Sequence, residues 1–285
     1  MRYEAPGSFE AASALLAAEQ GLTRVLAGGT DVLVQLRAGM VEPDLMVDIK
    51  RIPGSADITQ ENGGYRIGAA VSCAAQNEHA GVKAMWPGVC EAADLIGSTQ
   101  VQGRCTMVGN LCNASPAADS VPAMIAAGAT VRIVGPTGTR EAAVEDITVG
   151  VGKTSLAKGE VVESIFLPAQ AGNSGDAYLR FIPRTEMDIA VVGCGVNLTL
   201  DASGTCTAAK VSLGAVAITA LVVEDAANAI IGTKLDDAAL DKMAAAASAA
   251  CKPINDKRGT IEFRTDVAGV LARRAALIAK ERAEA

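Results

Sequence analysis

The stretch "TMVGNLCNASPAADSVPAM" (Thr106–Met124) decides how this chain is interpreted, because it is small and polar within a sequence that is 50% hydrophobic. Its glycine, Gly109, has no side chain and therefore lets another group approach the backbone closely. Thr106, Asn110 and Ser115 surround that glycine with hydroxyl and amide hydrogen-bonding groups. We therefore expect this stretch to be a binding loop rather than a connection between core elements.

Asp119 is the only acidic residue of this stretch, and two roles are open to it. An isolated carboxylate among small neutral residues is suited to accept hydrogen bonds from sugar-type hydroxyl groups. The alternative is that Asp119 is the N-cap of the helix predicted over "SVPAMIAAG". Both roles are compatible only if one carboxylate oxygen remains free.

A second small-residue loop lies in "RVLAGGTDVLVQL" (Arg24–Leu36), where a short strand ends and a helix begins. Gly28 and Gly29 permit backbone conformations that are closed to residues with a Cβ atom. Successive N–H groups there can face a bound anion such as a diphosphate, and Thr30 can add a hydroxyl donor. The alternative is a tight strand-to-helix turn with no ligand.

Neither loop has a known nucleotide-binding fingerprint. The pattern GxGxxG with an acid about twenty residues later is absent, which argues against a Rossmann dinucleotide fold. The pattern GxxxxGK[ST] is absent as well, so the chain is not expected to be a P-loop ATPase. A diphosphate would have to be held by the two separate loops together.

The composition narrows the class of protein further. A formal net charge of −7 without a basic stripe argues against a nucleic-acid partner. There is no apolar run of about 18 residues, so we expect no membrane span. The N-terminal segment lacks the apolar region of a secretory signal, and we therefore expect a cytoplasmic protein.

The residues that usually build catalytic or metal sites are scarce. The seven cysteines are scattered without a CxxC pair, so we expect no iron–sulfur cluster here and interpret them as buried and inert. His79 is the only histidine, so the chain has few residues from which to build a zinc site or a Ser-His-Asp triad. The sequence therefore predicts no catalytic side chain and no metal site in this chain.

The order of predicted elements indicates an α+β protein. A capped helix from Ser8 precedes a strand, the glycine turn, a helix and a second strand at "DLMVDI", which is β-α-β order. The polar segment Pro168–Ala177 is the best domain boundary, which places one domain at 1–170 and a second at 171–285. Three strand-like runs and two helices follow that boundary and predict an antiparallel meander covered by helices.

The last predicted helix, "DVAGVLARRAALIAKERAEA", has large apolar residues at helical spacing. Val267, Val270, Leu271, Leu277 and Ile278 are expected to form its buried face.

At this point the two motifs can be compared with a known family. "AGGTDVLVQLRAG…PDLMVDIKRIPG" together with "GRCTMVGNLCNASPAADSVPAM" resembles the FAD-binding medium subunit of the molybdenum hydroxylases, the xanthine dehydrogenase and carbon monoxide dehydrogenase type enzymes. The resemblance also covers "EVVESIFLP" and "YLRFIPRTEMDIAVV" and thus nearly the whole chain. The pattern TxxGN followed by ASPAAD is its most specific part.

The resemblance implies a fold. It implies a two-lobed α/β FAD-binding domain of the vanillyl-alcohol-oxidase type, with lobes at about 1–57 and 58–170. It further implies a C-terminal domain with a three-stranded antiparallel sheet and a helical bundle.

The resemblance also implies a set of FAD-binding residues. One loop would wrap the diphosphate, the other would close on it, Asp119 would meet ribityl or ribose hydroxyls, and Val162 would lie near the isoalloxazine ring. Two positions depart from the family pattern: Val108 replaces a glycine, and Arg180 replaces a lysine. The implied cofactor-binding residues are Ala27, Gly28, Gly29, Thr30, Asp31, Thr106, Gly109, Asn110, Ser115, Asp119, Val162 and Arg180.

The activity implied is electron transfer within a complex. A large partner subunit would hydroxylate the substrate at a molybdenum–molybdopterin cofactor, and a small partner would carry two [2Fe–2S] clusters. This chain would pass the electrons through FAD to NAD, a quinone or another acceptor, in a heterotrimer that can pair into a dimer of trimers. Two alternatives stay open: a free-standing FAD oxidoreductase of the same fold, and a flavin-free scaffold subunit.

Overall fold

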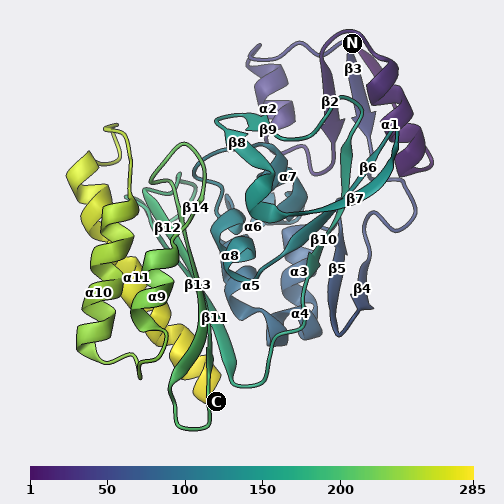
Figure 1. Ribbon diagram of the computed structural model, residues 1–285. Helices are drawn as coiled ribbons and strands as arrows, with labels where there is room; N and C mark the ends of the chain where they lie inside the picture. Colours follow the sequence, from purple (N-terminus) through teal and green to yellow (C-terminus); the bar gives the residue numbers. More distant parts are fainter.

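The computed structural model describes all 285 residues, and its first lobe is a small parallel sheet with two helices (Figure 1). Its elements are β1 (Arg2–Glu4), α1 (Phe9–Ala18), β2 (Thr23–Leu26), α2 (Val32–Arg37) and β3 (Leu45–Asp48). The strand order is β1-β3-β2, and β2 pairs with β3 in parallel. The predicted β-α-β order is therefore confirmed, with α2 as the crossover. The Ser8 hydroxyl caps α1 by accepting the Ala11 N–H at 3.1 Å.

The second lobe is built on a five-stranded antiparallel sheet with the order β4-β5-β10-β6-β7. Its strands are β4 (Ile58–Glu61), β5 (Gly64–Gly68), β6 (Thr130–Gly135), β7 (Gly138–Ala143) and β10 (Val161–Leu167). The helices are α3 (Cys73–Glu78), α4 (Ala80–Met85), α5 (Pro87–Asp94), α6 (Thr99–Gln102), α7 (Met107–Cys112) and α8 (Ser120–Ala126). A 3₁₀ turn (Val144–Asp146) and the hairpin of β8 (Thr148–Gly150) and β9 (Lys153–Thr154) complete it.

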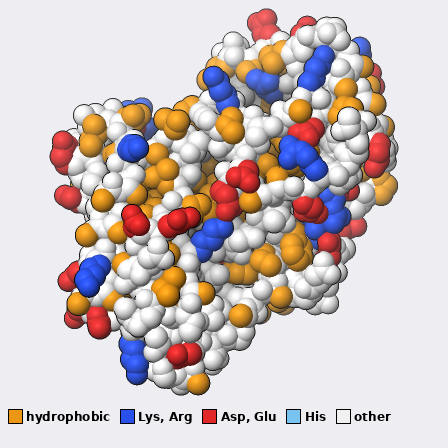
Figure 2. Space-filling model, in the orientation of Figure 1, with side chains coloured by type: hydrophobic (Ala, Val, Ile, Leu, Met, Phe, Trp, Pro, Cys, Tyr) orange, Lys and Arg blue, Asp and Glu red, His pale blue; other side chains and the backbone are white.

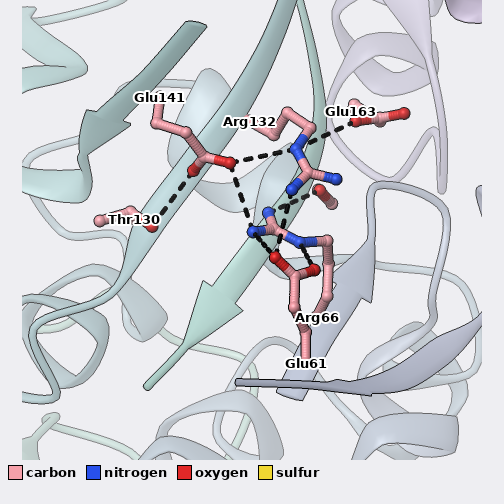
Figure 3. A network of polar contacts seen from close by, with 7 residues as sticks. Glu61, Arg66, Thr130, Arg132, Glu141 and Glu163 are labelled. Atoms are coloured by element: carbon pink, nitrogen blue, oxygen red, sulfur yellow. Dashed lines mark hydrogen bonds and ion pairs between the residues drawn. The ribbon is translucent and has the colours of Figure 1, made fainter. Parts of the chain in front are cut away.

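One face of this sheet packs on the helices, and the other carries an ion network that reaches all five strands (Figure 3). Arg132 donates to Glu141 at 3.0 Å and to Glu61 at 3.2 Å. The Arg66 guanidinium binds Glu61 from the neighbouring strand and stacks on the Phe166 ring at 5.1 Å. The network thus ties the edge strand β4 to the rest of the sheet.

The C-terminal part places an antiparallel sheet between two layers of helices (Figure 1). Its strands are β11 (Ser174–Phe181), β12 (Val192–Leu200), β13 (Cys206–Gly214) and β14 (Leu221–Val222). The helices α9 (Glu224–Ile230), α10 (Asp237–Ala250) and α11 (Ile261–Glu284) cover one side. The three long strands were predicted, but β11 begins at Ser174, inside the polar segment Pro168–Ala177 that was expected to be a boundary between domains. The two-residue β14 and the helix α9 are additions to that prediction.

The buried face of α11 differs from the predicted one. Val270 and Leu277 are 46% and 43% exposed, and of the five predicted residues only Leu271 is fully buried. Val267 and Ile278 are partly buried. Apart from Leu271 and Arg264, the buried residues are small: Ala268, Gly269, Ala272, Ala275, Ala276, Ala279 and Ala283. These let the helix approach the sheet so closely that a Cβ on Gly175 would lie 2.1 Å from the Ala279 carbonyl oxygen. The face of α11 that is buried is therefore the one that allows close packing on the sheet, and not the one with the largest apolar residues.

Two hydrophobic cores exist, and a charged cluster lies where α5 of the first contacts β11 and α11 of the second. Arg282 binds the Glu91 carboxylate and donates to the Asp176 carbonyl oxygen at 2.7 Å. The Asp176 carboxyl is only 3% exposed, and its Oδ1 has no hydrogen-bond partner. Burial raises the pKa of Asp176 to about 7, although the backbone N–H groups of Gly88 and Val89 oppose that rise.

We expect Asp176→Asn to remove a pH dependence of stability. Because the folded pKa is raised to about 7 from 3.8, the native state binds this proton more tightly than the unfolded chain does. The stabilisation is complete below the unfolded pKa and is lost as the pH rises through the folded one. In urea unfolding, the variant should therefore gain about 2 kcal/mol relative to the natural chain between about pH 5 and pH 8. Asp266→Asn, at an exposed position, is the control, and equal pH dependence of Asp176→Asn and the natural chain would contradict the prediction.

Candidate functional site

The two small-residue loops predicted from the sequence line one cavity of about 510 Å³. It lies where β2 and α2 of the first lobe face α7 and the β8–β9 hairpin of the second (Figure 1). Most of its walls come from three separate segments, roughly 23–35, 105–113 and 152–162, and Leu16, Ile49 and Ile96 complete them. The prediction that the two loops act together is thus supported by their position around one space.

Most of the residues predicted for the site line this cavity, and three do not. The lining residues are Ala27, Gly28, Gly29, Thr30, Asp31, Thr106, Gly109, Asn110 and Val162. Ser115, Asp119 and Arg180 lie outside the lining. The Ser115 hydroxyl accepts the Ala117 N–H at 3.3 Å and so supports the turn before α8.

Gly28 and Gly29 differ in the reason for which each must be glycine. A Cβ on Gly28 would lie 2.0 Å from the carbonyl oxygen of Arg104, because the backbones of the two loops touch there. Gly29 has φ +80°, a conformation that residues with a Cβ rarely adopt. The pair therefore turns the chain after β2 and also lets the second loop close against the first.

Side chains join the loops as well. The Asn113 amide donates to the Asp31 carboxylate at 3.2 Å, and Gln35 donates to the Asn113 oxygen at 3.1 Å. Burial raises the pKa of Asp31, whose carboxylate makes no cap bond to α2. Asp31 therefore holds the second loop in place from the first.

The predicted loop from Thr106 onward is in fact a short helix, α7. The Thr106 hydroxyl accepts the Gly109 N–H at 2.9 Å and caps that helix. Thr106 also lies close against Gly109, where a Cβ would be 3.0 Å from its hydroxyl oxygen. Val108 lies inside the helix without a positive φ, so its branched side chain is compatible with the backbone there.

Asp119 does not line the cavity, but the residue after it contacts Asn110, which does. The Asn110 oxygen accepts the Ser120 hydroxyl at 2.7 Å, and Ser120 directly follows Asp119. The Asp119 carboxylate accepts the Arg180 guanidinium at 3.0 Å and the Tyr178 hydroxyl at 3.2 Å. Burial raises the pKa of Asp119 to about 6, and the charge of Arg180 opposes that rise. Asp119 occupies the N-cap position of α8 but makes no side-chain cap bond.

Arg180, which forms the buried ion pair with Asp119, also contacts a residue next to the cavity wall. Its side chain is 4% exposed, and it also donates to the Leu95 carbonyl oxygen at 2.7 Å. The next residue, Ile96, lines the cavity. Together with Val162 and Val108, Ile96 gives the cavity an apolar part.

Two cations of the cavity were not predicted from the sequence. Arg24 and Lys158 line it, and neither forms an ion pair, whereas the lining Glu160 is bound by Arg140 at 2.6 Å. Lys158 precedes Gly159, which has φ +87° and lets the chain turn into β10. A lysine beside a glycine turn is a weak sequence signal, so only the fold brings it to the two loops.

FAD fits this arrangement of groups. The volume lies within the range of roughly 300–1,000 Å³ that small-ligand sites occupy. The bare backbone at Gly28 and Gly29 permits close approach of a diphosphate, and Arg24 and Lys158 supply unpaired positive charge. The apolar lining residues are suited to a flat aromatic ring, and Asn110 and Thr30 add polar groups to the same cavity.

The rest of the surface shows no other dominant chemistry on the face that Figure 2 presents. Lys and Arg side chains are interspersed there with Asp and Glu, and no stripe of one sign is visible. No helix combines the length and the apolar character needed to cross a bilayer.

Comparison with known proteins assigns both parts of the chain. A family model described as FAD binding domain in molybdopterin dehydrogenase matches residues 1–170. A second, described as CO dehydrogenase flavoprotein C-terminal domain, matches residues 177–279. The carbon monoxide dehydrogenase medium chain of Afipia carboxidovorans is 34% identical over 99% of this chain and 97% of its own length. A putative xanthine dehydrogenase FAD-binding subunit of Escherichia coli is 29% identical over 87% of this chain and 86% of its own.

The fold agrees with a solved relative. The crystal structure of a Cu,Mo-CO dehydrogenase in its cyanide-inactivated form contains a chain that superposes with a TM-score of 0.94 at 34% identity, covering 99% of this chain and 98% of that one. That coverage includes the residues of both hydrophobic cores and of the two loops. The chain therefore belongs to the FAD-binding oxidoreductase family of the molybdopterin dehydrogenases, in which the FAD-binding domain is followed by the CO dehydrogenase flavoprotein C-terminal domain.

Proposed function

We propose that this chain is the FAD-carrying electron-transfer subunit of a molybdenum hydroxylase complex. The observation that carries the proposal is that both small-residue loops, with Gly28 on one and Gly109 on the other, line one cavity of suitable size and chemistry. The relatives' names, medium chain and FAD-binding subunit, support a place within a larger assembly.

The residues of the cavity have distinct roles in this proposal. The loop Ala27–Asp31 and the start of α7 at Thr106–Asn110 hold the diphosphate through backbone N–H groups and hydroxyls. Val162 packs against the flavin ring. Behind Asn110, Asp119 and Arg180 fix the segment that meets the flavin and its ribityl hydroxyls, and Ser115 supports the turn between them.

Bound FAD supplies the redox chemistry, and the residues of this chain bind, orient and shield it. In the proposed complex the chain receives electrons from [2Fe–2S] clusters of a small partner subunit and passes them to NAD, a quinone or another acceptor. The molybdenum–molybdopterin cofactor and the hydroxylated substrate belong to a large partner subunit. The assembly is a heterotrimer that can pair into a dimer of trimers.

A visible absorption spectrum of the purified chain, with the acid-released cofactor identified, tests the proposal. We expect flavin bands without an iron–sulfur shoulder, and FAD as the released compound. Added FAD should also stabilise flavin-free protein by about 2.7 kcal/mol at a hundredfold excess over Kd. A folded, colourless protein whose melting temperature does not respond to FAD would favour the flavin-free scaffold.

The free-standing oxidoreductase is distinguished by activity. Isolated, FAD-loaded chain should oxidise no purine, aldehyde or carbon monoxide, since the substrate site belongs to the partner. Turnover of any of these by the isolated chain would favour the alternative.

A further inference from the structure

Two cysteines that are distant in the sequence meet at the edge of the cavity. Cys73 begins α3, and its N–H donates to the carbonyl oxygen of Cys105 at 2.8 Å. This direct backbone hydrogen bond places the two residues side by side, as a disulfide needs, since it joins Cα atoms roughly 4.4–6.8 Å apart. Each thiol also lies near enough to the other to shift its pKa.

The two members of this pair are not equivalent. Cys105 is 3% exposed and lines the cavity, whereas Cys73 is completely buried behind it. The neighbouring Cys73 thiol lowers the pKa of the Cys105 thiol, whereas Cys105 and burial together raise the pKa of Cys73. Cys105 is therefore the better nucleophile of the two, and it faces the space through which a small reagent arrives.

Cys112 is a natural comparison within the same wall. It also lines the cavity, but burial raises its pKa to about 12 and no second thiol lies beside it. Cys112 is the more exposed of the two, so a faster oxidation of Cys105 than of Cys112 reports on the thiol pair and not on access.

We propose that Cys73 and Cys105 are a redox-active dithiol, in which a peroxide entering the cavity oxidises Cys105 and Cys73 then closes a disulfide. In the first step the Cys105 thiolate attacks a peroxide oxygen: an S–O bond forms, the O–O bond breaks, and hydroxide leaves and becomes water. In the second step the Cys73 sulfur attacks the Cys105 sulfenic acid: the S–S bond forms, the S–O bond breaks, and water leaves with the Cys73 proton. Two thiols and one hydrogen peroxide thus yield one disulfide and two waters.

The disulfide would tether the residue before Thr106 to the first turn of α3. Because Thr106 caps α7 and lines the cavity, this tether is a covalent brace at the wall of the proposed FAD site. The sequence indicates buried, inert cysteines; burial holds for this pair, but their mutual contact makes them reactive toward each other. The chemistry uses only this chain and a peroxide, so it stands apart from the proposed electron transfer.

The test treats the purified full chain, freed of flavin so that the cavity is open, with hydrogen peroxide. Free thiols are then alkylated, and peptides are mapped by mass spectrometry with and without dithiothreitol. We expect a dithiothreitol-sensitive link between the Cys73 and Cys105 peptides, formed at least ~10-fold faster than any oxidation of Cys112.

Three variants make the outcome decisive. In Cys73→Ser, Cys105 should persist as a sulfenic acid that dimedone traps, because no thiol resolves it. In Cys105→Ser, Cys73 should remain unmodified, and Cys112→Ser should form the disulfide as the natural chain does. Oxidation of Cys105 and Cys112 at equal rates, or a Cys105 that stays reduced while other thiols react, would overturn the proposal.

Discussion

Gly28→Val is expected to yield a protein without bound FAD whose C-terminal helices remain folded. A Cβ added at this position would lie 2.0 Å from the Arg104 carbonyl oxygen, so the valine forces the two cavity loops apart. Overpacking of this kind costs about 1–3 kcal/mol of folding stability. The displaced loops should in addition weaken FAD at least ~100-fold, which corresponds to about 2.7 kcal/mol.

The measurements for Gly28→Val are flavin content after purification, titration with FAD, and circular dichroism. Gly172→Val is the matched control, because nothing lies within 4 Å of a Cβ at Gly172. It should keep the flavin of the natural chain. If Gly28→Val kept FAD at the natural affinity, the diphosphate would not lie at this loop.

Asp119→Ala is expected to lower the free energy of unfolding by about 3–5 kcal/mol, the cost of leaving one member of a buried ion pair without its partner. The side chains of Asp119 and Arg180 are 10% and 4% exposed, so water cannot replace the lost carboxylate. Tyr178 loses its acceptor in the same variant. Urea unfolding monitored by fluorescence of Trp86, the single tryptophan, measures the effect.

Two controls separate this effect from charge removal in general. Asp237→Ala removes an acid that is 89% exposed and paired with Arg273, and it should cost less than about 1 kcal/mol. The double variant Asp119→Leu, Arg180→Met should recover most of the lost stability, because it leaves no unpaired buried charge. Equal losses in Asp119→Ala and Asp237→Ala would show that burial of the pair contributes nothing.

The sequence predicted the parts of the fold that depend on neighbours in the chain. The cap at Ser8 and the turn at Gly28 and Gly29 are decided by residues a few positions apart, and the structure has both of them. The prediction that the two loops, distant in the sequence, form one site came from the family resemblance. In the structure the two loops are in direct contact, because the backbone of Gly28 touches that of Arg104.

Other features lie outside the reach of local patterns. The position of β10 between β5 and β6 depends on partners roughly 30 to 100 residues away in the chain. The buried face of α11 was mispredicted because large apolar residues suggest a core-facing stripe, whereas most of the residues that this helix buries are alanine. The contact of Cys73 with Cys105 and the cavity position of Lys158 likewise arise only from tertiary packing.

The central position of β10 has a consequence for how this protein matures in the cell. Strand β10 ends at Leu167, and its first residues form a wall of the cavity. At a synthesis rate of about 5–20 residues per second, on the order of ten seconds separate the emergence of Gly28 from that of this strand. Throughout that interval the loop at Gly28 and Gly29 has been synthesised, but the cavity wall that β10 supplies has not. FAD can therefore bind only late in synthesis, and until then the nascent chain remains without flavin.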